Sequence, residues 1–357
     1  PTVVTPAHLD HFVAELHDQA RAEGEVRCQR GPGREQREVL AREGLDDLAL
    51  GVVLPLVVRN EYYLQILTQG YVLAISACGL NVIVGLAGQL SLAHAGFFGI
   101  GAYAVALLAT KAGLAFWLGL PAGILLCTVT GYAIGSICLR SKGHYFAIFT
   151  LAVGLIIHLV IQKWESLTHG HVGVIGIPGP GPLGPIGFDS TAARSYLALF
   201  FLALTVAAVS RLVRSPIGRT LMAVRESEAL AAAVGIDVMA AKRMAFAVSA
   251  ALAGLAGGLF AGFIGFLGPE SSNVEMTFNT LLYIMVGGVG SLSGPVAGTF
   301  IVYGLSQVLA VLQQYQMVIF GLALVLLILF MPTGLAGLWR ARVTKPLPAE
   351  APAKAAR

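Results

Sequence analysis

The sequence predicts an all-α fold, a polytopic membrane helical bundle of about ten spanning or re-entrant segments with both termini cytoplasmic. Composition predicts it first, because 56% of the 357 residues are hydrophobic and only 12% are charged. The mean hydropathy of +0.78 also lies far above that of soluble proteins. Lys and Arg gather between the apolar runs. In a membrane protein the placement of these charges, more than the net charge of +4, indicates the orientation. We expect membrane lipid around the chain and no nucleic acid as a partner.

Three regions differ in composition. Residues 1–47 form a polar, acidic extension with six arginines against ten Asp and Glu, and we expect it in the cytoplasm. Residues 48–339 form the transmembrane domain, and residues 340–357 form a basic cytoplasmic tail. No apolar run follows a basic stretch at the start, so we expect no cleavable signal peptide.

Apolar runs succeed one another along the transmembrane domain. They are Leu48–Val58, Tyr62–Leu86, Leu92–Thr110, Leu114–Leu139, Tyr145–Ile161, Ser195–Val213, Met244–Leu267, Met276–Val289, Pro295–Leu312 and Met317–Met331. A helix needs about 20 residues to cross the hydrocarbon core, and the first and eighth runs are the shortest. All ten runs crossing, or eight crossing with these two re-entrant, both fit the loops.

Positive charge in the short loops sets the orientation, because such loops stay in the cytoplasm. The loop 211–243 carries six Lys and Arg, and Arg140 and Lys142 mark another cytoplasmic turn. The loop 163–194 between them carries only Lys163 and Arg194. The loop 163–194 is therefore expected outside the cytoplasm.

The predicted spans lack the groups that drive transport from within. None of them contains Asp, Glu or Lys, which argues against proton relays, and no row of arginines marks a voltage sensor. His94 and His158 are the titratable groups expected deep in the membrane. No phosphate-binding G-x-x-x-x-G-K-[ST] loop occurs, so transport is either passive or driven by another protein.

Enzyme chemistry is not indicated either. The four cysteines form no C-x-x-C pair, and we expect neither a disulfide nor a metal site. No nucleophile and base converge in the sequence. We therefore expect no enzymatic activity in this chain.

The stretch GLNVIVGLAGQLSLAHAGFFGIGAY at 79–103 is apolar but interrupted by glycines and polar residues. Irregular backbone at membrane depth is tolerated only where protein packs on it or a cavity adjoins it. We expect a helix break near Gly88 to Ser91. Its polar groups either line a translocation path or bond helix to helix. The candidate path residues are Asn81, Gly85, Gly88, Gln89, Ser91 and His94.

GGVGSLSGPVAG at 287–298 predicts a second break, after which Pro295 starts a new helix. Two interrupted segments suggest a transporter whose path lies between halves. This stretch adds four candidate path residues, Gly287, Gly288, Gly290 and Gly294.

The loop SPIGRTLMAVRESEALAAAVGI at 215–236 predicts a short amphipathic cytoplasmic helix. Ser215 and Pro216 are typical of a helix start, and Gly235 of a helix end. Arg219 and Arg225 alternate with apolar residues. The helix either docks on another protein or is a solvated connector.

These three stretches, with GHYFAIFTLAVG at 143–154 and AGLAGGLF at 253–260, resemble permeases of branched-chain amino acid ABC importers, of the LivM type. The similarity runs from about residue 79 to about residue 337, with five motifs in the same order. The chain departs from the family at Ala93, where glycine is usual, and in the loop Thr168–Gly173. The acidic extension has no counterpart in the family pattern.

The resemblance implies a bacterial inner-membrane subunit that imports leucine, isoleucine and valine from the periplasm. It implies a second, LivH-like permease, two ATP-binding subunits and a periplasmic substrate-binding protein as partners. ATP and Mg would bind to the partner ATPases, and no cofactor to this chain. The residues implied in ATPase coupling are Arg219, Arg225, Glu228, Ala232 and Gly235.

In this interpretation the opening stretch suits an amino acid. Uncapped helix ends supply partial charges for a zwitterion without any ionised side chain, while apolar walls suit an aliphatic side chain. Two other functions remain open. One is a urea or short-chain amide importer permease of the same superfamily, and the other is a stand-alone facilitator or channel.

Overall fold

The structure is a computed structural model that describes residues 60–308 except 142, 183–186 and 189. All of these belong to the unit Asp47–Arg357. The acidic extension, the run Leu48–Val58, the run Met317–Met331 and the basic tail lie outside the described residues. The predicted domain boundaries and cytoplasmic termini therefore stay predictions.

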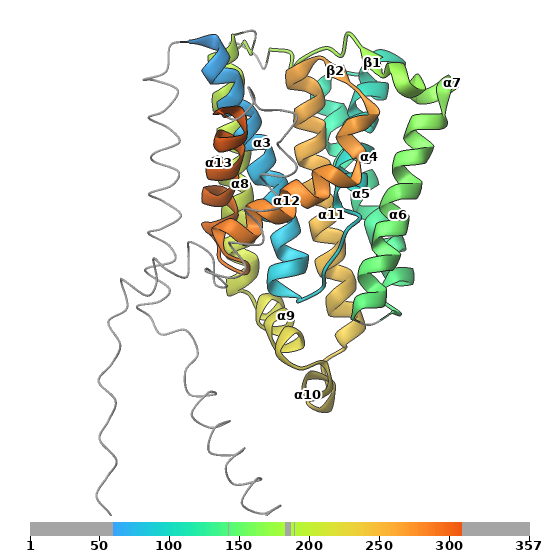
Figure 1. Cartoon of the computed structure of the whole chain (residues 1–357), viewed down its shortest axis with the longest axis vertical. Coiled ribbons are helices and arrows are strands. Elements are labelled where there is room, and N and C mark those ends of the chain that lie inside the picture. Colours follow the sequence, from blue (N-terminus) through green and yellow to red (C-terminus); the bar gives the residue numbers. More distant parts are fainter. Residues whose placement is uncertain (1–59, 142, 183–186, 189, 309–357) are drawn as a thin grey trace, which may run out of the picture. The chain divides into compact units, whose positions relative to one another are not determined.

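The described residues are helical except for short connections and one pair of two-residue strands (Figure 1). In chain order the elements are α3 (Glu61–Asn81), η1 (Val82–Leu86), α4 (His94–Thr110), α5 (Phe116–Cys138), α6 (His144–Lys163), α7 (Glu165–Thr168), η2 (Gly170–Val172), β1 (Val174–Ile175), α8 (Thr191–Arg214), α9 (Pro216–Glu226), α10 (Glu228–Ala233), α11 (Val238–Ile264), β2 (Phe266–Leu267), η3 (Pro269–Ser272), α12 (Val274–Gly287) and α13 (Gly294–Val308).

Five of these helical segments are long and apolar enough to cross a membrane: Glu61–Leu86, α5, α6, α8 and α11. The shorter α4 and α12 are apolar as well. These helices confirm the predicted all-α polytopic membrane fold. In Figure 1, α9 and α10 lie at one end of the bundle, and β1 and β2 at the other. The positive-inside rule assigns the end with α9 and α10 to the cytoplasm.

The central helix is α11, which packs against α3, α4 and α5. Glycines allow this approach. A Cβ added at Gly257 would lie 2.0 Å from the Phe98 carbonyl oxygen, and one at Gly101 would lie 2.4 Å from Gly254 Cα. Small residues let backbones come close, which is the main attraction between helices in lipid. The glycines of the AGLAGGLF motif are therefore packing residues.

The eighth predicted run forms a short helix. α12 has 14 residues, which is about 21 Å at 1.5 Å per residue and less than the about 30 Å of the hydrocarbon core. β2 and η3 precede it, and α13 then returns along α3. β2 pairs antiparallel with β1, with Val174 opposite Leu267. The eighth run thus contributes an interrupted segment.

Two helix boundaries differ from the predicted runs. α11 begins at Val238 instead of Met244, because Asp237 caps it by accepting a 2.9 Å hydrogen bond from the Ala240 amide. This adds Lys242 and Arg243 to the helix. α11 ends at Ile264 because Gly265 adopts a φ of +73°. Hydropathy alone does not register such caps.

We predict that Gly257→Ala lowers the free energy of unfolding by about 1–3 kcal/mol, because the added methyl group meets backbone rather than a flexible side chain. The midpoint of thermal unfolding in detergent measures this. Gly304→Ala is the matched control, since a Cβ at Gly304 meets nothing within 4 Å. Equal midpoints for the two variants would contradict the close packing of α11 on α4.

Candidate functional site: two helix breaks and the coupling helices

The helix that starts at Glu61 is interrupted in the opening stretch. Its last turn, η1, is π-helical, a geometry often found at functional sites. Gly88 then takes a φ of +67°, a conformation that favours glycine. The Gln89 amide donates to the Ile83 carbonyl at 3.1 Å, which satisfies one of the carbonyls freed at the helix end. Ser91 is buried within the interruption, and Gln89 is half-buried.

Threonines from two other helices bind the backbone where α4 begins. Thr150 of α6 accepts a 3.0 Å hydrogen bond from the Leu92 amide, and Thr277 of α12 accepts one of 3.0 Å from the Ala95 amide. The N-cap residue of α4 is Ala93, which has no side-chain acceptor. The threonines therefore replace an N-cap and tie the start of α4 to α6 and α12.

His94, a predicted path residue, lies between helices. It is only 2% exposed. Its Nε2 lies 2.9 Å from the Ser76 carbonyl oxygen, and its Nδ1 lies 3.4 Å from Ser249 Oγ. The ring thus joins α3, α4 and α11, which matches the helix-to-helix interpretation.

The second break follows α12. Gly288 and Gly290 have φ values of +116° and +77°. Ser291 Oγ donates to the Gly288 carbonyl at 2.6 Å and accepts from the Gly294 amide at 3.1 Å. A Cβ at Gly287 would lie 1.8 Å from the Gly294 carbonyl oxygen, so α12 and α13 meet there backbone to backbone. All four glycines predicted in this stretch lie at this crossing.

Asn81 joins the two breaks. Its Nδ2 donates to the Ser291 carbonyl at 2.8 Å, and its Oδ1 accepts from the Gly290 amide at 2.9 Å. A Cβ at Gly85 would lie 2.3 Å from Asn81 Oδ1 and 2.7 Å from the Gly290 nitrogen. Glycine at 85 therefore permits the contact, and Asn81 satisfies backbone groups that α12 and α13 leave unpaired.

Arg225, predicted in the coupling helix, reaches the same place from α9. Its Nη1 donates to the Gly85 carbonyl at 2.5 Å. A Cβ at Gly88 would lie 2.9 Å from Arg225 Cγ, and one at Gly290 would lie 2.9 Å from Arg225 Nη1. One arginine of the cytoplasmic loop thus contacts both helix breaks.

The predicted single helix at 215–236 is wrong, because the loop forms two helices. Ser215 caps α9 through a 3.2 Å hydrogen bond from the Gly218 amide, with Pro216 at the first helical position as expected. Ser227 is extended and caps α10 through the Leu230 amide at 3.2 Å. Gly235, with a φ of +85°, follows the end of α10 as expected. A second N-cap serine inside the run is the signal that divides it.

The other predicted coupling residues divide into two groups. Glu228 pairs with Lys242 of α11, whose side chain is buried, so Glu228 is engaged within its own chain. Arg219, Ala232 and Gly235 are exposed.

The outer face of α10 is apolar. Leu230 is 67% exposed and Val234, just after the helix, is 70% exposed, with Ala229, Ala232 and Ala233 exposed beside them. An exposed apolar patch at the cytoplasmic end of a membrane protein is typical of a protein-binding surface.

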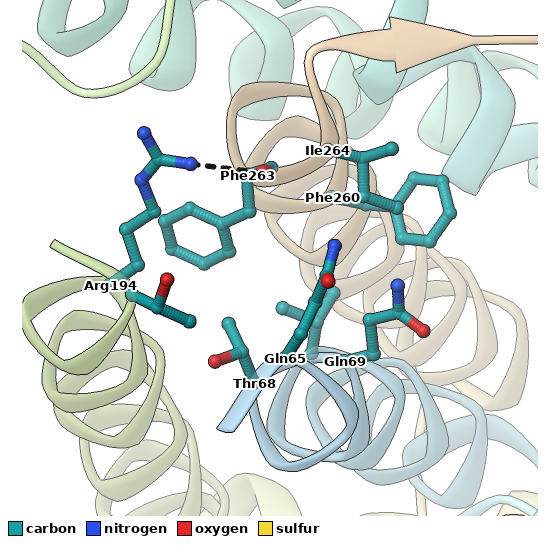
Figure 2. A pocket seen from close by; sticks show the side chains of 9 residues that line it. Gln65, Thr68, Gln69, Arg194, Phe260, Phe263 and Ile264 are labelled. Carbon is teal, nitrogen blue, oxygen red and sulfur yellow. Dashed lines mark hydrogen bonds between the residues drawn. The ribbon is translucent and has the colours of Figure 1, made fainter. Parts of the chain in front are cut away.

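A cavity of about 110 Å³ lies near the other end of α3, where α3, α8 and α11 meet (Figure 2). Both polar and apolar side chains line it, and in Figure 2 Arg194 lies beside Phe263. The lining residues are Gln65, Thr68, Gln69, Val72, Thr191, Arg194, Phe260, Phe263 and Ile264. The cavity is smaller than the about 300–1,000 Å³ of a complete ligand pocket, so it is too small to enclose a small molecule by itself.

The polar groups around this cavity are held in place. Arg194 Nη1 donates to the Phe263 carbonyl at 3.4 Å, the bond drawn in Figure 2, and Gln69 Oε1 accepts from the Tyr303 hydroxyl. Thr68 Oγ1 lies 2.5 Å from Ser195 Oγ of α8. In the sequence Gln65 and Gln69 do not stand out as site residues, because a polar residue near a helix start resembles an ordinary interfacial residue. Their four-residue spacing on α3 is the signal that places them on one face.

No group of three or more His, Cys, Asp or Glu suited to a metal ion occurs among the residues that the structure describes. His169 and His171 lie in the loop between α6 and β1.

Comparison with known proteins adds independent findings. The family described as branched-chain amino acid transport system / permease component matches residues 62–329. The high-affinity branched-chain amino acid transport system permease protein LivM of Escherichia coli K12 is 33% identical over 317 residues, which cover 82% of this chain and 74% of that protein. The corresponding permease protein LivH of Salmonella typhimurium is 26% identical over 298 residues, covering 77% of this chain and 96% of that protein. No solved structure matches the chain.

We predict that Asn81→Leu loosens the second break, because it leaves the Gly290 amide and the Ser291 carbonyl without their partner. Hydrogen exchange of a peptide spanning residues 286–294 should speed up by about tenfold or more, which corresponds to about 1.4 kcal/mol of local stability. Thr128→Val is the control, because Thr128 bonds only within α5, to the Ile124 carbonyl. Unchanged exchange in Asn81→Leu would mean that Asn81 does not hold the break.

Proposed function

The chain belongs to the branched-chain amino acid transport system / permease component family, and from that premise we propose that it imports leucine, isoleucine and valine as one permease subunit of an ATP-driven importer. The family match carries the proposal, because it spans both helix breaks and both coupling helices. The LivM-type resemblance, the transport role without enzymatic activity, and the multi-pass location in the inner membrane are thereby confirmed. The substrate and the inward direction are the proposal.

The cavity supports an amphiphilic cargo. Val72, Phe260 and Phe263 offer apolar walls, and Arg194, Gln65 and Gln69 offer polar groups in the same lining. A zwitterion with an aliphatic side chain needs both kinds of surface. The cavity is too small to enclose such a molecule, and a second permease subunit is the expected source of the missing wall.

The LivM and LivH relatives indicate a pair of permeases in one importer. We take the second subunit to be LivH-like, and two ATP-binding subunits and a periplasmic binding protein to complete the assembly. ATP and Mg bind to the ATP-binding subunits, and this chain binds no cofactor. The apolar outer face of α10, with Leu230 and Val234 exposed, is the surface best suited to an ATP-binding subunit.

The two helix breaks form the cytoplasmic part of the path. Asn81, Gly85, Gly88 and Gly290 meet there, at the opposite end of α3 from the cavity. The apolar runs predicted to span contain no Asp, Glu or Lys, so we take the energy to enter from the ATP-binding subunits.

The reconstituted importer tests the substrate. We predict that leucine, presented by the binding protein, stimulates ATP hydrolysis and accumulates inside proteoliposomes, whereas urea does neither. Stimulation by urea alone would assign the chain to the urea and short-chain amide importers.

A control separates the remaining alternative. Proteoliposomes that contain only this chain should show no leucine uptake above that of empty vesicles. Uptake by the isolated chain without ATP would indicate a stand-alone facilitator or channel.

We predict that Arg194→Gln lowers leucine uptake by about tenfold or more, because one charge-assisted hydrogen bond contributes about 1.5–3 kcal/mol. Arg194→Lys should retain more uptake, since it keeps the positive charge. Arg194 also bonds to the carbonyls of Phe188 and Phe263. Thermal unfolding of both variants checks that a loss of stability from these bonds does not cause the loss of uptake. Normal uptake by Arg194→Gln would remove the cavity from the path.

A further inference from the structure

We propose that Arg225 is a positioning residue through which α9 holds the two helix breaks closed at the cytoplasmic end of the bundle. This inference rests on the proposed function, because Arg225 can transmit a movement to the breaks only if a partner protein moves α9. It changes the role expected for Arg225 from binding an ATPase to linking that ATPase's docking region with the path.

Arg225 bonds to the backbone at the end of a helix. Arg225 Nη1 donates to the carbonyl of Gly85, which lies in the last, π-helical turn before the first break. Carbonyls at a helix end lack intrahelical donors and carry the negative end of the helix dipole. A guanidinium is therefore the kind of group that stabilises this end, and it comes from a different part of the chain, 140 residues away.

The same Arg225 side chain contacts both breaks. Gly88 leaves room for Arg225 Cγ, and Gly290 leaves room for Arg225 Nη1, with only 2.9 Å from each ideal Cβ position. Asn81 already joins Gly290 to the first break from the other side. Arg225 and Asn81 thus both bond where the two breaks meet. Arg225 belongs to α9, which is part of the cytoplasmic loop.

One face of α9 is held against the bundle. Gly218, Leu221 and Val224 are buried there, whereas Arg219 and Arg225 are exposed, and of these two Arg225 bonds to the Gly85 carbonyl. α10, which follows, is joined to α11 by the pair of Glu228 and Lys242. A force applied to the exposed face of α10 therefore reaches α9, and through Arg225 it reaches the two breaks.

The experiment compares variants in the complete reconstituted importer. Arg225→Ala is expected to assemble with the ATP-binding subunits and to hydrolyse ATP, but to transport at least tenfold less leucine per ATP. Arg225→Lys should recover part of this ratio, because an ammonium group can still donate to a carbonyl although it lacks the planar fork of arginine. Arg219→Ala, on the same helix and equally exposed, should keep the normal ratio, because among the described residues the Arg219 side chain makes no hydrogen bond to either break.

Two results of this comparison would overturn the proposal. One is a normal ratio of leucine to ATP in Arg225→Ala. The other is loss of Arg225→Ala from the complex, as we expect for Leu230→Asp on the apolar face of α10, because Arg225 would then serve docking.

A cross-linking measurement keeps the test independent of the substrate. The ideal Cβ at Gly88 lies 3.4 Å from Arg225 Cβ, close to the about 3.5–4.5 Å of a disulfide. The double variant Gly88→Cys/Arg225→Cys should form a disulfide in membranes under mild oxidation, and ATP binding to the importer should reduce the yield at least threefold. Gly88→Cys/Arg219→Cys, which places the second thiol on the exposed position, should not cross-link.

Absence of the disulfide in Gly88→Cys/Arg225→Cys, or a yield that ATP leaves unchanged, would overturn the proposal. A failure of the proposed function is distinguishable, because it shows as a wild-type importer that does not respond to leucine while the disulfide still forms.

Discussion

Backbone groups in a bilayer must find hydrogen-bond partners within the protein, and this constraint governs the arrangement of the interrupted helices. The first break draws its partners from three other helices: Thr150 of α6, Thr277 of α12 and Arg225 of α9. The second break is bonded by Asn81 of α3. Because each break is satisfied by side chains from elsewhere, neither can move without a change in those helices.

Glycine makes these contacts possible. At Gly85, Gly257 and Gly287 an added Cβ would fall within 2.3 Å of another atom. The close approach of α11 to α4, and of α12 to α13, therefore depends on the absence of side chains. In lipid, where apolar burial gives little attraction between helices, such packing supplies much of the stability. The same property that packs the bundle thus also brings the two breaks within reach of each other.

α3 connects the parts that transport requires. Its first turns carry Gln65 and Gln69 at the cavity, and Asn81 at its end and Gly85 in the following η1 lie at the breaks. One helix thus extends from the expected entry of an amino acid to the cytoplasmic loop. In the proposed importer, movement of α9 and α10 by an ATP-binding subunit would act through Arg225 on the end of this segment, so the path would receive its energy without a titratable relay.

Neighbouring residues alone predict the apolar runs, the positive loops, the interruptions near Gly88 and Gly290, and the helix ends at Ser215 and Gly235. They do not predict the hydrogen-bond partners of the polar residues. Asn81 bonds a residue 210 positions away and Arg225 one 140 positions away. Likewise, only the tertiary structure shows that Glu228 pairs with Lys242 of α11 and that Arg225, although exposed, bonds to the Gly85 carbonyl of η1. Local periodicity and charge therefore determined the fold class and the orientation. Only the packing of distant segments decided which polar groups bond to one another, since that depends on which backbone lies opposite each side chain.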